Sequence, residues 1–251
     1  MPTSRAATRT PLTRDRVLRT AMELADRNGL DALTMRGLAD ELDVEAMSLY
    51  HHLPNKNAIL DGVVEVAFGE IEEEVRGFDA GVPIGATDDR ASWSAALRDR
   101  ILGARRVLLR HPWVPVVMES RATFGPTMAR YVDGVVGLMR AGGLSHDLIH
   151  HSLHALGSRM YGFVQELGDD DASTPTDPAE LEAMAALAPN LAAMLAEVAH
   201  VDPDTTLGWC DDQEEFEFGL DILLEGIERR RVAEAARVAD GAAHLAPGGR
   251  T

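Results

Sequence analysis

Apolar residues recur at helical spacing through almost the whole chain, and no segment shows the strict alternation of apolar and polar residues that is typical of a strand. The helical stretches end at Gly, at Pro or at residues that cap helices, and they are long compared with the connections between them. A chain of 251 residues can bury a substantial core. The pattern therefore predicts an all-α protein in which long helices pack as a bundle.

The sequence argues against several classes of protein. No apolar run reaches the roughly 18 residues of a membrane span, and residues 1–13 are polar and contain arginine, unlike a signal peptide. A single cysteine, Cys210, cannot form an intramolecular disulfide, which favours a cytoplasmic location. The sequence has no Gly-rich phosphate loop, nucleophile elbow or set of metal ligands, so we do not expect an enzyme.

Charge is distributed unevenly along the chain. The net charge of −17 is unfavourable for a nucleic-acid partner. Residues 1–60, however, contain eight basic and eight acidic residues, and residues 1–19 contain five arginines against one aspartate. We expect this basic end to be able to approach phosphate, while the acidic remainder repels DNA and so restricts its orientation.

Two short amphipathic helices joined by a tight turn are predicted over residues 34–51. The first begins after the N-cap Thr34, and its apolar residues share one face: Met35, Leu38, Ala39 and Leu42. Asp43 and Val44 form the turn into a second helix over about residues 45–51. A helix over about residues 13–28, which Gly29 ends, precedes the pair, and Asn55 caps a long helix after it. This order has the shape of a helix-turn-helix, whose second helix enters the major groove of DNA.

The second helix of the pair carries residue types that suit contact with DNA. Small or unbranched side chains at its leading end allow close approach to bases, whereas Leu49 and Leu53 are expected in the core. Lys56, the only lysine of the chain, can share a phosphate with the N-terminus of the next helix. The same pattern also occurs in proteins that never contact DNA, so a helical ligand-binding or interaction protein without DNA binding is the alternative.

From Leu12 to about Ala67 the chain resembles the TetR family of repressors. The matching pieces are a first helix that ends in Asn28-Gly29, the stretch LTMRGLADEL and the stretch SLYHHLPNKNAIL. The resemblance implies a three-helix DNA-binding domain and assigns DNA contact to these residues: Thr34, Arg36, Ala46, Met47, Ser48, Tyr50, His51, His52 and Lys56. Asp43 departs from the usual turn glycine, although Asp tolerates the left-handed region better than most residues. The run His51-His52-Leu53 departs from the commoner aromatic pattern, which bears on base preference.

The rest of the chain is similar, more weakly, to the C-terminal domain of the tetracycline-repressor subgroup. The similarity rests on RRVLLRHPWVPVVM and on FEFGLDILLEGIE. It implies a ligand pocket among the fourth to eighth helices and a homodimer formed by the eighth and the last helix. It also implies that a magnesium–tetracycline chelate would need a histidine within residues 115–118, which contain none, whereas Glu166 falls where a partner-subunit carboxylate would lie. We therefore expect no metal or cofactor and an effector other than tetracycline itself.

Aromatic, methionine and polar side chains of this C-terminal part are candidates for the effector pocket. They are Trp93, Met118, Arg121, Phe124, Met128, Tyr131, Ser158, Tyr161 and Gln165. Separately, His146, His150 and His154 share one face of a helix that Ser145 caps. Metal binding and proton sensing are both open for this row, but ordinary interface or surface histidines are the favoured interpretation.

These observations predict four segments. Residues 1–11 form a flexible arm, 12–60 the helix-turn-helix domain, 61–238 the helical effector-binding and dimerisation domain, and 239–251 a disordered tail. Within the larger domain we expect one Ala/Leu/Met-rich helix that begins near Asp177 and Pro178, and a last helix over about residues 212–236. The expected function is a cytoplasmic transcriptional regulator, a repressor that a small molecule releases from a palindromic operator, with no membrane partner.

Overall fold

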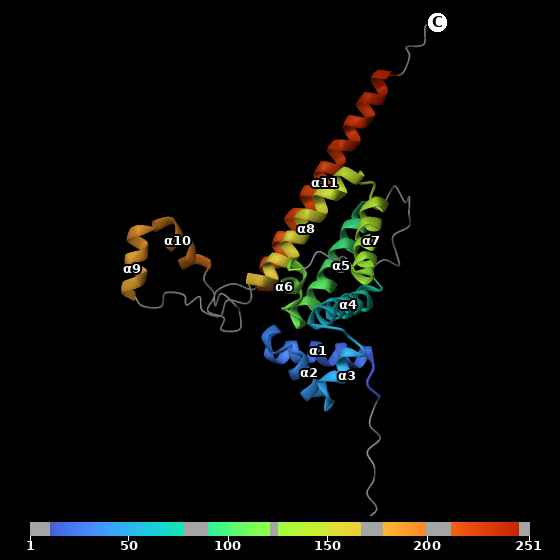
Figure 1. Ribbon diagram of the computed structural model, residues 1–251. Coiled ribbons are helices and arrows are strands. Elements are labelled where there is room, and N and C mark those ends of the chain that lie inside the picture. Colours follow the sequence, from blue (N-terminus) through green and yellow to red (C-terminus); the bar gives the residue numbers. More distant parts are fainter. Residues whose placement is uncertain (1–10, 78–89, 121–124, 167–177, 199–211, 246–251) are drawn as a thin grey trace, which may run out of the picture. The chain divides into compact units, whose positions relative to one another are not determined.

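The structure is a computed structural model that describes residues 11–77, 90–120, 125–166, 178–198 and 212–245. Within these ranges every regular element is a helix, which confirms the predicted all-α class (Figure 1). Its contacts divide the chain into two compact units. Unit 1 comprises residues 1–77 and 103–133, and unit 2 comprises residues 78–102 and 134–251.

Unit 1 contains the helices of the predicted DNA-binding region. They are α1 (Arg14–Asn28), the short 3-10 helix η1 (Leu30–Ala32), α2 (Met35–Leu42), α3 (Ala46–Tyr50) and α4 (Lys56–Val75). The second part of α5 (Arg90–Arg110), α6 (Val114–Glu119) and the first part of α7 (Pro126–Ala141) complete the unit.

Local side chains set where the N-terminal helices of unit 1 begin. Thr13, Thr34 and Asn55 each accept a hydrogen bond from a backbone N–H three residues further on, as N-caps do. Gly29 ends α1 with a φ of 75°, a value that glycine adopts at little cost. The predicted caps at these positions are confirmed.

The core of unit 1 forms where α1 crosses α4 and where α2 and α3 pack beneath them. Val17 and Leu18 of α1, Leu38 of α2 and Leu49 of α3 are all at most 2% exposed. A methyl group at Gly62 of α4 would lie only 2.4 Å from Leu18 Cδ2, so this glycine allows the two helices to approach closely.

Unit 2 contains the first part of α5, the second part of α7, α8 (His146–Glu166), α9 (Pro178–Leu187), α10 (Pro189–Val198) and α11 (Asp212–Leu245). Helices α8 and α11 lie side by side, and α11 runs on past α8 (Figure 1). Arg98 of α5 donates to Asp221 Oδ1 at 2.7 Å and to Glu217 Oε2 at 2.6 Å, which joins α5 to α11.

Two predictions about helix ends are wrong. The Ala/Leu/Met-rich helix is two helices, because Pro189 cannot continue α9 and starts α10 instead. Helix α11 extends to Leu245, so the predicted disordered tail 239–251 begins in a helix. The stretch after Ala236 is rich in alanine, which favours continuing a helix that has already formed.

Some predictions lie outside the described residues, namely most of the N-terminal arm and the acidic stretch of residues 167–177. Among the helices that are described, none is both long and apolar enough to cross a membrane.

Candidate nucleic-acid interface

The turn between α2 and α3 has the geometry that the helix-turn-helix requires. Asp43 ends α2 in the left-handed region, with φ 54° and ψ 49°. The N–H of Val44 then bonds back to the carbonyl of Ala39 at 3.0 Å, which closes the turn. Asp43 therefore takes the conformation for which the family usually has glycine, as the sequence predicts.

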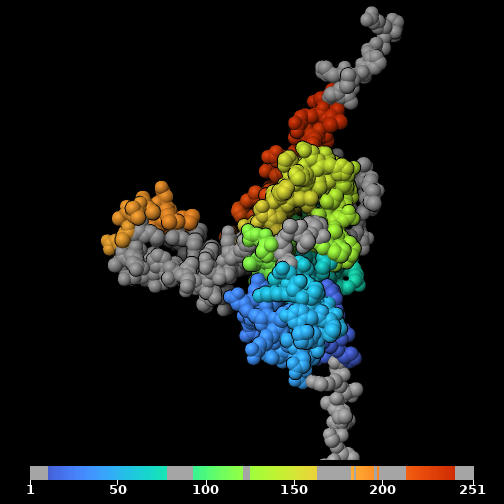
Figure 2. Space-filling view, in the orientation of Figure 1, coloured from blue at the N-terminus to red at the C-terminus, as the bar shows by residue number. Residues whose placement is uncertain are grey.

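Helix α3 has one buried and one exposed face. Leu49 on α3 and Leu53 just after it are 0% and 2% exposed, which confirms that they belong to the core. In contrast, Met47 is 71% exposed and Tyr50 is 45% exposed. The segment from α2 to the start of α4, drawn in light blue, lies at the surface of unit 1 in Figure 2. Large apolar side chains held away from a well-packed core are typical of a contact surface.

The remaining predicted DNA contacts frame this exposed face. His51 follows α3 and is exposed, whereas Ala46, Ser48 and His52 are partly exposed. Arg36 lies in the first turn of α2, and Lys56 is the first residue of α4; both are exposed. A cation at a helix N-terminus adds to the positive end of the helix dipole, so Lys56 and α4 together offer a site for one phosphate.

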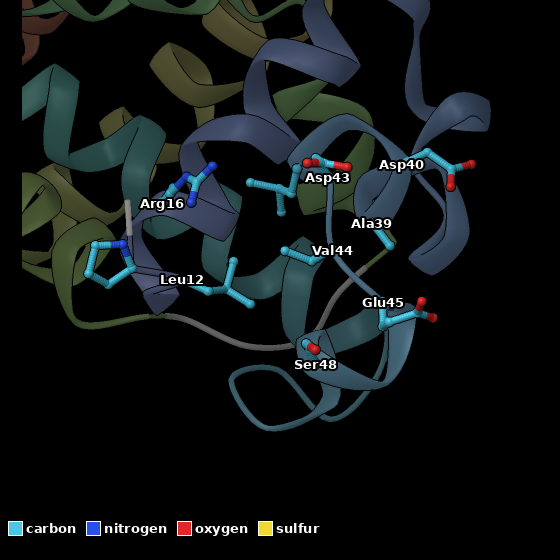
Figure 3. A pocket seen from close by; sticks show the side chains of 10 residues that line it. Leu12, Arg16, Ala39, Asp40, Asp43, Val44, Glu45 and Ser48 are labelled. Atoms are coloured by element: carbon cyan, nitrogen blue, oxygen red, sulfur yellow. The ribbon is translucent and has the colours of Figure 1, made fainter. Parts of the chain in front are cut away.

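An open hollow of about 870 Å³ lies beside this face (Figure 3). Residues 11–16 border it on one side and the α2–α3 turn on the other. Asp40, Asp43 and Glu45 contribute carboxylates to its lining, against the single guanidinium of Arg16. This side is acidic and disfavours phosphate, so backbone contacts to DNA have to come from the cations at the N-termini of α2 and α4.

Ion pairs and buried polar groups hold α1 in place. Arg27 Nη2 lies 2.6 Å from Glu41 Oε1 and ties α1 to α2. Asp26 Oδ1 accepts a hydrogen bond from Trp113 Nε1 at 2.6 Å and lies 2.9 Å from His111 Nδ1. Because 85 residues separate Asp26 from His111, no local pattern in the sequence indicates this cluster.

The candidate effector residues belong to both units. Met118, Met128 and Tyr131 lie in unit 1, where the rings of Tyr131 and Phe68 meet edge to face at 5.9 Å. Trp93, Ser158 and Tyr161 lie in unit 2. Arg121, Phe124 and the side chain of Gln165 lie outside the described part of the chain. A single pocket formed by all of these residues remains a prediction.

Two of the unit 2 candidates have polar atoms shielded from water. Trp93 is 1% exposed, and its Nε1 has no hydrogen-bond partner among the described residues. A buried N–H without a partner is rare in proteins, so it is a candidate donor to a bound molecule. Desolvation raises the pKa of Tyr161 to about 12, so its hydroxyl stays protonated at neutral pH and can also donate.

The histidine row on α8 is exposed. The rings of His150 and His154 are 4.8 Å apart, and His151 Nε2 lies 3.9 Å from Asp147 Oδ1. Within the described part of one chain, however, no three His, Cys, Asp or Glu side chains are placed to hold a metal ion. The choice between the alternatives for this row stays open.

Comparison with known proteins identifies the architecture. Residues 17–63 match the family described as bacterial regulatory proteins, tetR family, and residues 86–231 match the tetracyclin repressor-like C-terminal domain. The chain is 30% identical over 223 residues to the HTH-type transcriptional repressor DrrR1 of Streptomyces coeruleorubidus, covering 86% of this chain and 77% of that protein. It is 29% identical over 221 residues to the class D tetracycline repressor of Escherichia coli, covering 86% and 89%.

Solved structures agree with these matches. The apo form of ActR from Streptomyces coelicolor has a TM-score of 0.67 and 27% identity, covering 90% of this chain and 99% of that chain. The complex of ActR with actinorhodin has a TM-score of 0.65 and 26% identity, covering 87% and 96%.

These matches extend over both the helix-turn-helix and the helical C-terminal part. TetR-type proteins are non-enzymatic regulators that bind operator DNA as dimers and respond to small-molecule effectors. The chain belongs to the TetR family of DNA-binding transcriptional regulators.

Proposed function

We propose that the exposed face of α3 and the N-termini of α2 and α4 contact the operator. The residues are those predicted from the sequence: Thr34, Arg36, Ala46, Met47, Ser48, Tyr50, His51, His52 and Lys56. The observation that carries the proposal is the division of α3 into a buried face and an exposed face with Met47 and Tyr50. Met47 and Tyr50 would meet base edges or thymine methyl groups, and Arg36 and Lys56 would meet phosphates.

The DNA-reading part is proposed to end at residue 60, and residues 61–238 to provide effector binding and dimerisation. In a two-fold symmetric dimer, the two copies of α3 would enter successive major grooves about one helical turn apart. The operator would therefore be a palindrome. Since such DNA lies in the bacterial cytoplasm, we propose a cytoplasmic location.

For the effector we propose a multi-ring aromatic molecule with polar substituents. ActR has been solved with actinorhodin, and a tetracycline repressor of Acinetobacter baumannii has been solved with minocycline. In this chain the buried indole of Trp93 and the phenol of Tyr161 supply both ring surface and donors. The residues of α6 do not fit a magnesium–tetracycline chelate, because residues 115–118 offer Pro, Val and Met rather than an imidazole.

Release from the operator would follow from a shift in population. An effector that binds more tightly to a dimer with the wrong spacing of the two α3 helices lowers DNA affinity by that ratio of affinities. Helix α4 begins at the DNA-contacting Lys56 and continues for 20 residues, so we propose it as the element that transmits the change.

The test is selection of bound duplexes from fragmented genomic DNA, followed by competition with aromatic compounds. We expect enrichment of one palindrome, affinity that falls steeply with salt, and release by a subset of the compounds. A dimer that binds no duplex even at low salt would instead support the alternative of a helical ligand-binding protein without DNA binding.

A further inference from the structure

His111 lies between two carboxylates from different helices. Its side chain is 8% exposed, with Nδ1 2.9 Å from Asp26 Oδ1 and Nε2 3.2 Å from Glu70 Oε2. An ionised carboxylate can only accept a hydrogen bond, and a neutral imidazole has only one N–H. With a neutral ring, one of the two contacts therefore sets a nitrogen lone pair against a carboxylate oxygen. With both nitrogens protonated, both contacts are hydrogen bonds.

The charges around the ring favour this second state. The charged groups that face it are Asp26 from α1, Glu70 from α4 and Arg110 from α5, whose Nη2 lies 3.4 Å from Glu70 Oε2. Next to α6, Trp113 contributes only its indole, which donates to the same Asp26 oxygen. One guanidinium leaves two carboxylates with an excess negative charge, and a proton on His111 removes it.

A further arginine is close to this group. Arg19 of α1 attracts Glu70, but its own hydrogen bond goes to Asp15, with Nε 3.0 Å from Oδ2. Because Asp15 offsets the charge of Arg19, the balance around His111 is unchanged.

The cluster connects the DNA-reading helices to the rest of unit 1. Asp26 lies in the last turn of α1, which packs against α2, and Glu70 lies in the second half of α4. His111 follows α5 directly, and its carbonyl accepts from the N–H of Val114 at the start of α6. One imidazole thus links three separate segments of the chain.

We propose that His111 is a proton-operated clamp between α1 and α4. With the proton on, the clamp holds α1 in the position that presents α3 to DNA. As the pH rises through the range in which imidazoles titrate, the proton is lost, one hydrogen bond becomes a repulsion, and operator affinity falls. This device is separate from the effector; its consequence for DNA rests on the proposed interface, whereas the clamp itself does not.

The decisive variant is Glu70→Gln. The amide nitrogen that this substitution introduces can donate to an unprotonated His111 Nε2, while the amide oxygen can still accept from Arg110. The neutral ring then donates through Nδ1 to Asp26, so the clamp is complete without the extra proton. Glu73→Gln is the matched control, because Glu73 lies on the same helix, pairs with Arg76 and removes the same charge.

Three measurements at pH 6 and pH 8 test the clamp. They are the thermal unfolding midpoint, the affinity for a duplex selected from genomic DNA, and the protonation of the His111 nitrogens by ¹⁵N NMR. From pH 6 to pH 8 we expect the wild type and Glu73→Gln to lose about five- to tenfold more affinity than Glu70→Gln, as a charge-assisted hydrogen bond to a partly exposed carboxylate implies. Because His51 and His52 are present in all three proteins, their titration cancels in this comparison.

The outcomes separate the clamp from the DNA interface. The proposal is overturned if His111 has a single protonated nitrogen at pH 6, or if Glu70→Gln retains the pH dependence of the wild type. Should no duplex bind, the unfolding midpoint and the NMR spectrum still decide on the clamp, and only the proposed interface fails.

Discussion

In the DNA-reading module, residues 13–60, the helix caps join residues three positions apart: Thr13 to Arg16, Thr34 to Gly37 and Asn55 to Ala58. In the α5–α11 seam of unit 2, by contrast, Arg98 bonds to residues 119 and 123 positions away. The module is therefore specified by contacts visible in short stretches of sequence, whereas the seam exists only after the chain has folded. This difference predicts which substitutions act on folding, which act on DNA and which act on neither.

The largest effect is expected inside the module, at the buried face of α3. Leu49→Ala should lower the free energy of unfolding by about 2–5 kcal/mol, because it opens a cavity in a fully buried position. Denaturant titration measures this loss. Met47→Ala is the control on the same helix and should stay within about 0.5 kcal/mol, because Met47 is 71% exposed. Equal losses for the two variants would contradict the division of α3 into two faces.

The exposed face of the same helix should affect DNA rather than folding. Tyr50→Ala is expected to weaken operator binding by about 1–3 kcal/mol, roughly 5- to 150-fold, with the unfolding free energy unchanged within about 0.5 kcal/mol. Gel shift and thermal unfolding measure the two quantities. Val116→Ala removes a similarly exposed side chain, 49% against 45%, and should change neither quantity. A loss of folding in Tyr50→Ala would place this residue in the core.

The seam should contribute less to stability because it is partly exposed. Arg98→Met removes the ion pairs with Glu217 and Asp221 and should cost about 1 kcal/mol at low salt, and less at high salt. Hydrogen bonds from Gln213 and then Arg98 lower the pKa of Glu217. A carboxyl whose pKa is lower in the folded state stabilises above its unfolded value near pH 4 and loses this contribution as the pH falls.

The cost of Arg98→Met should therefore shrink in acid, which unfolding curves at pH 7 and pH 3.5 can measure. A cost that stays constant between these pH values would mean that Arg98 acts through packing of its aliphatic stem.

The smallest effect is expected at the turn between the two short helices. Asp43→Gly should raise the unfolding free energy by at most about 1 kcal/mol, because glycine adopts a φ of 54° without strain but gains entropy in the unfolded chain. Asp43→Ala should destabilise by about 1–2 kcal/mol, because alanine has neither the freedom of glycine nor a side chain that bonds locally. Equal stability of the two variants would show that this turn does not require a left-handed residue.

Within the module, the sequence determined most of what the structure contains. The caps at Thr34 and Asn55, the stop at Gly29, the left-handed Asp43 and the buried Leu49 are all predicted correctly. Each depends on neighbours within about one helical turn, and backbone hydrogen bonding and helical periodicity act over that range. The ends of α9 and α11 differ from the prediction, because one proline starts a new helix and because an alanine-rich stretch extends a helix at little cost.

Only the tertiary structure decided which distant groups meet. No periodicity relates Asp26 to His111 and Trp113, and none marks the indole nitrogen of Trp93 as buried with no partner among the described residues. Such contacts depend on how helices pack, and packing is set by the summed shape of many side chains rather than by any one spacing. The sequence alone determined an all-α chain with a DNA-reading module at its start. The fold added the ring of His111 held between two carboxylates, which links that module to the rest of unit 1.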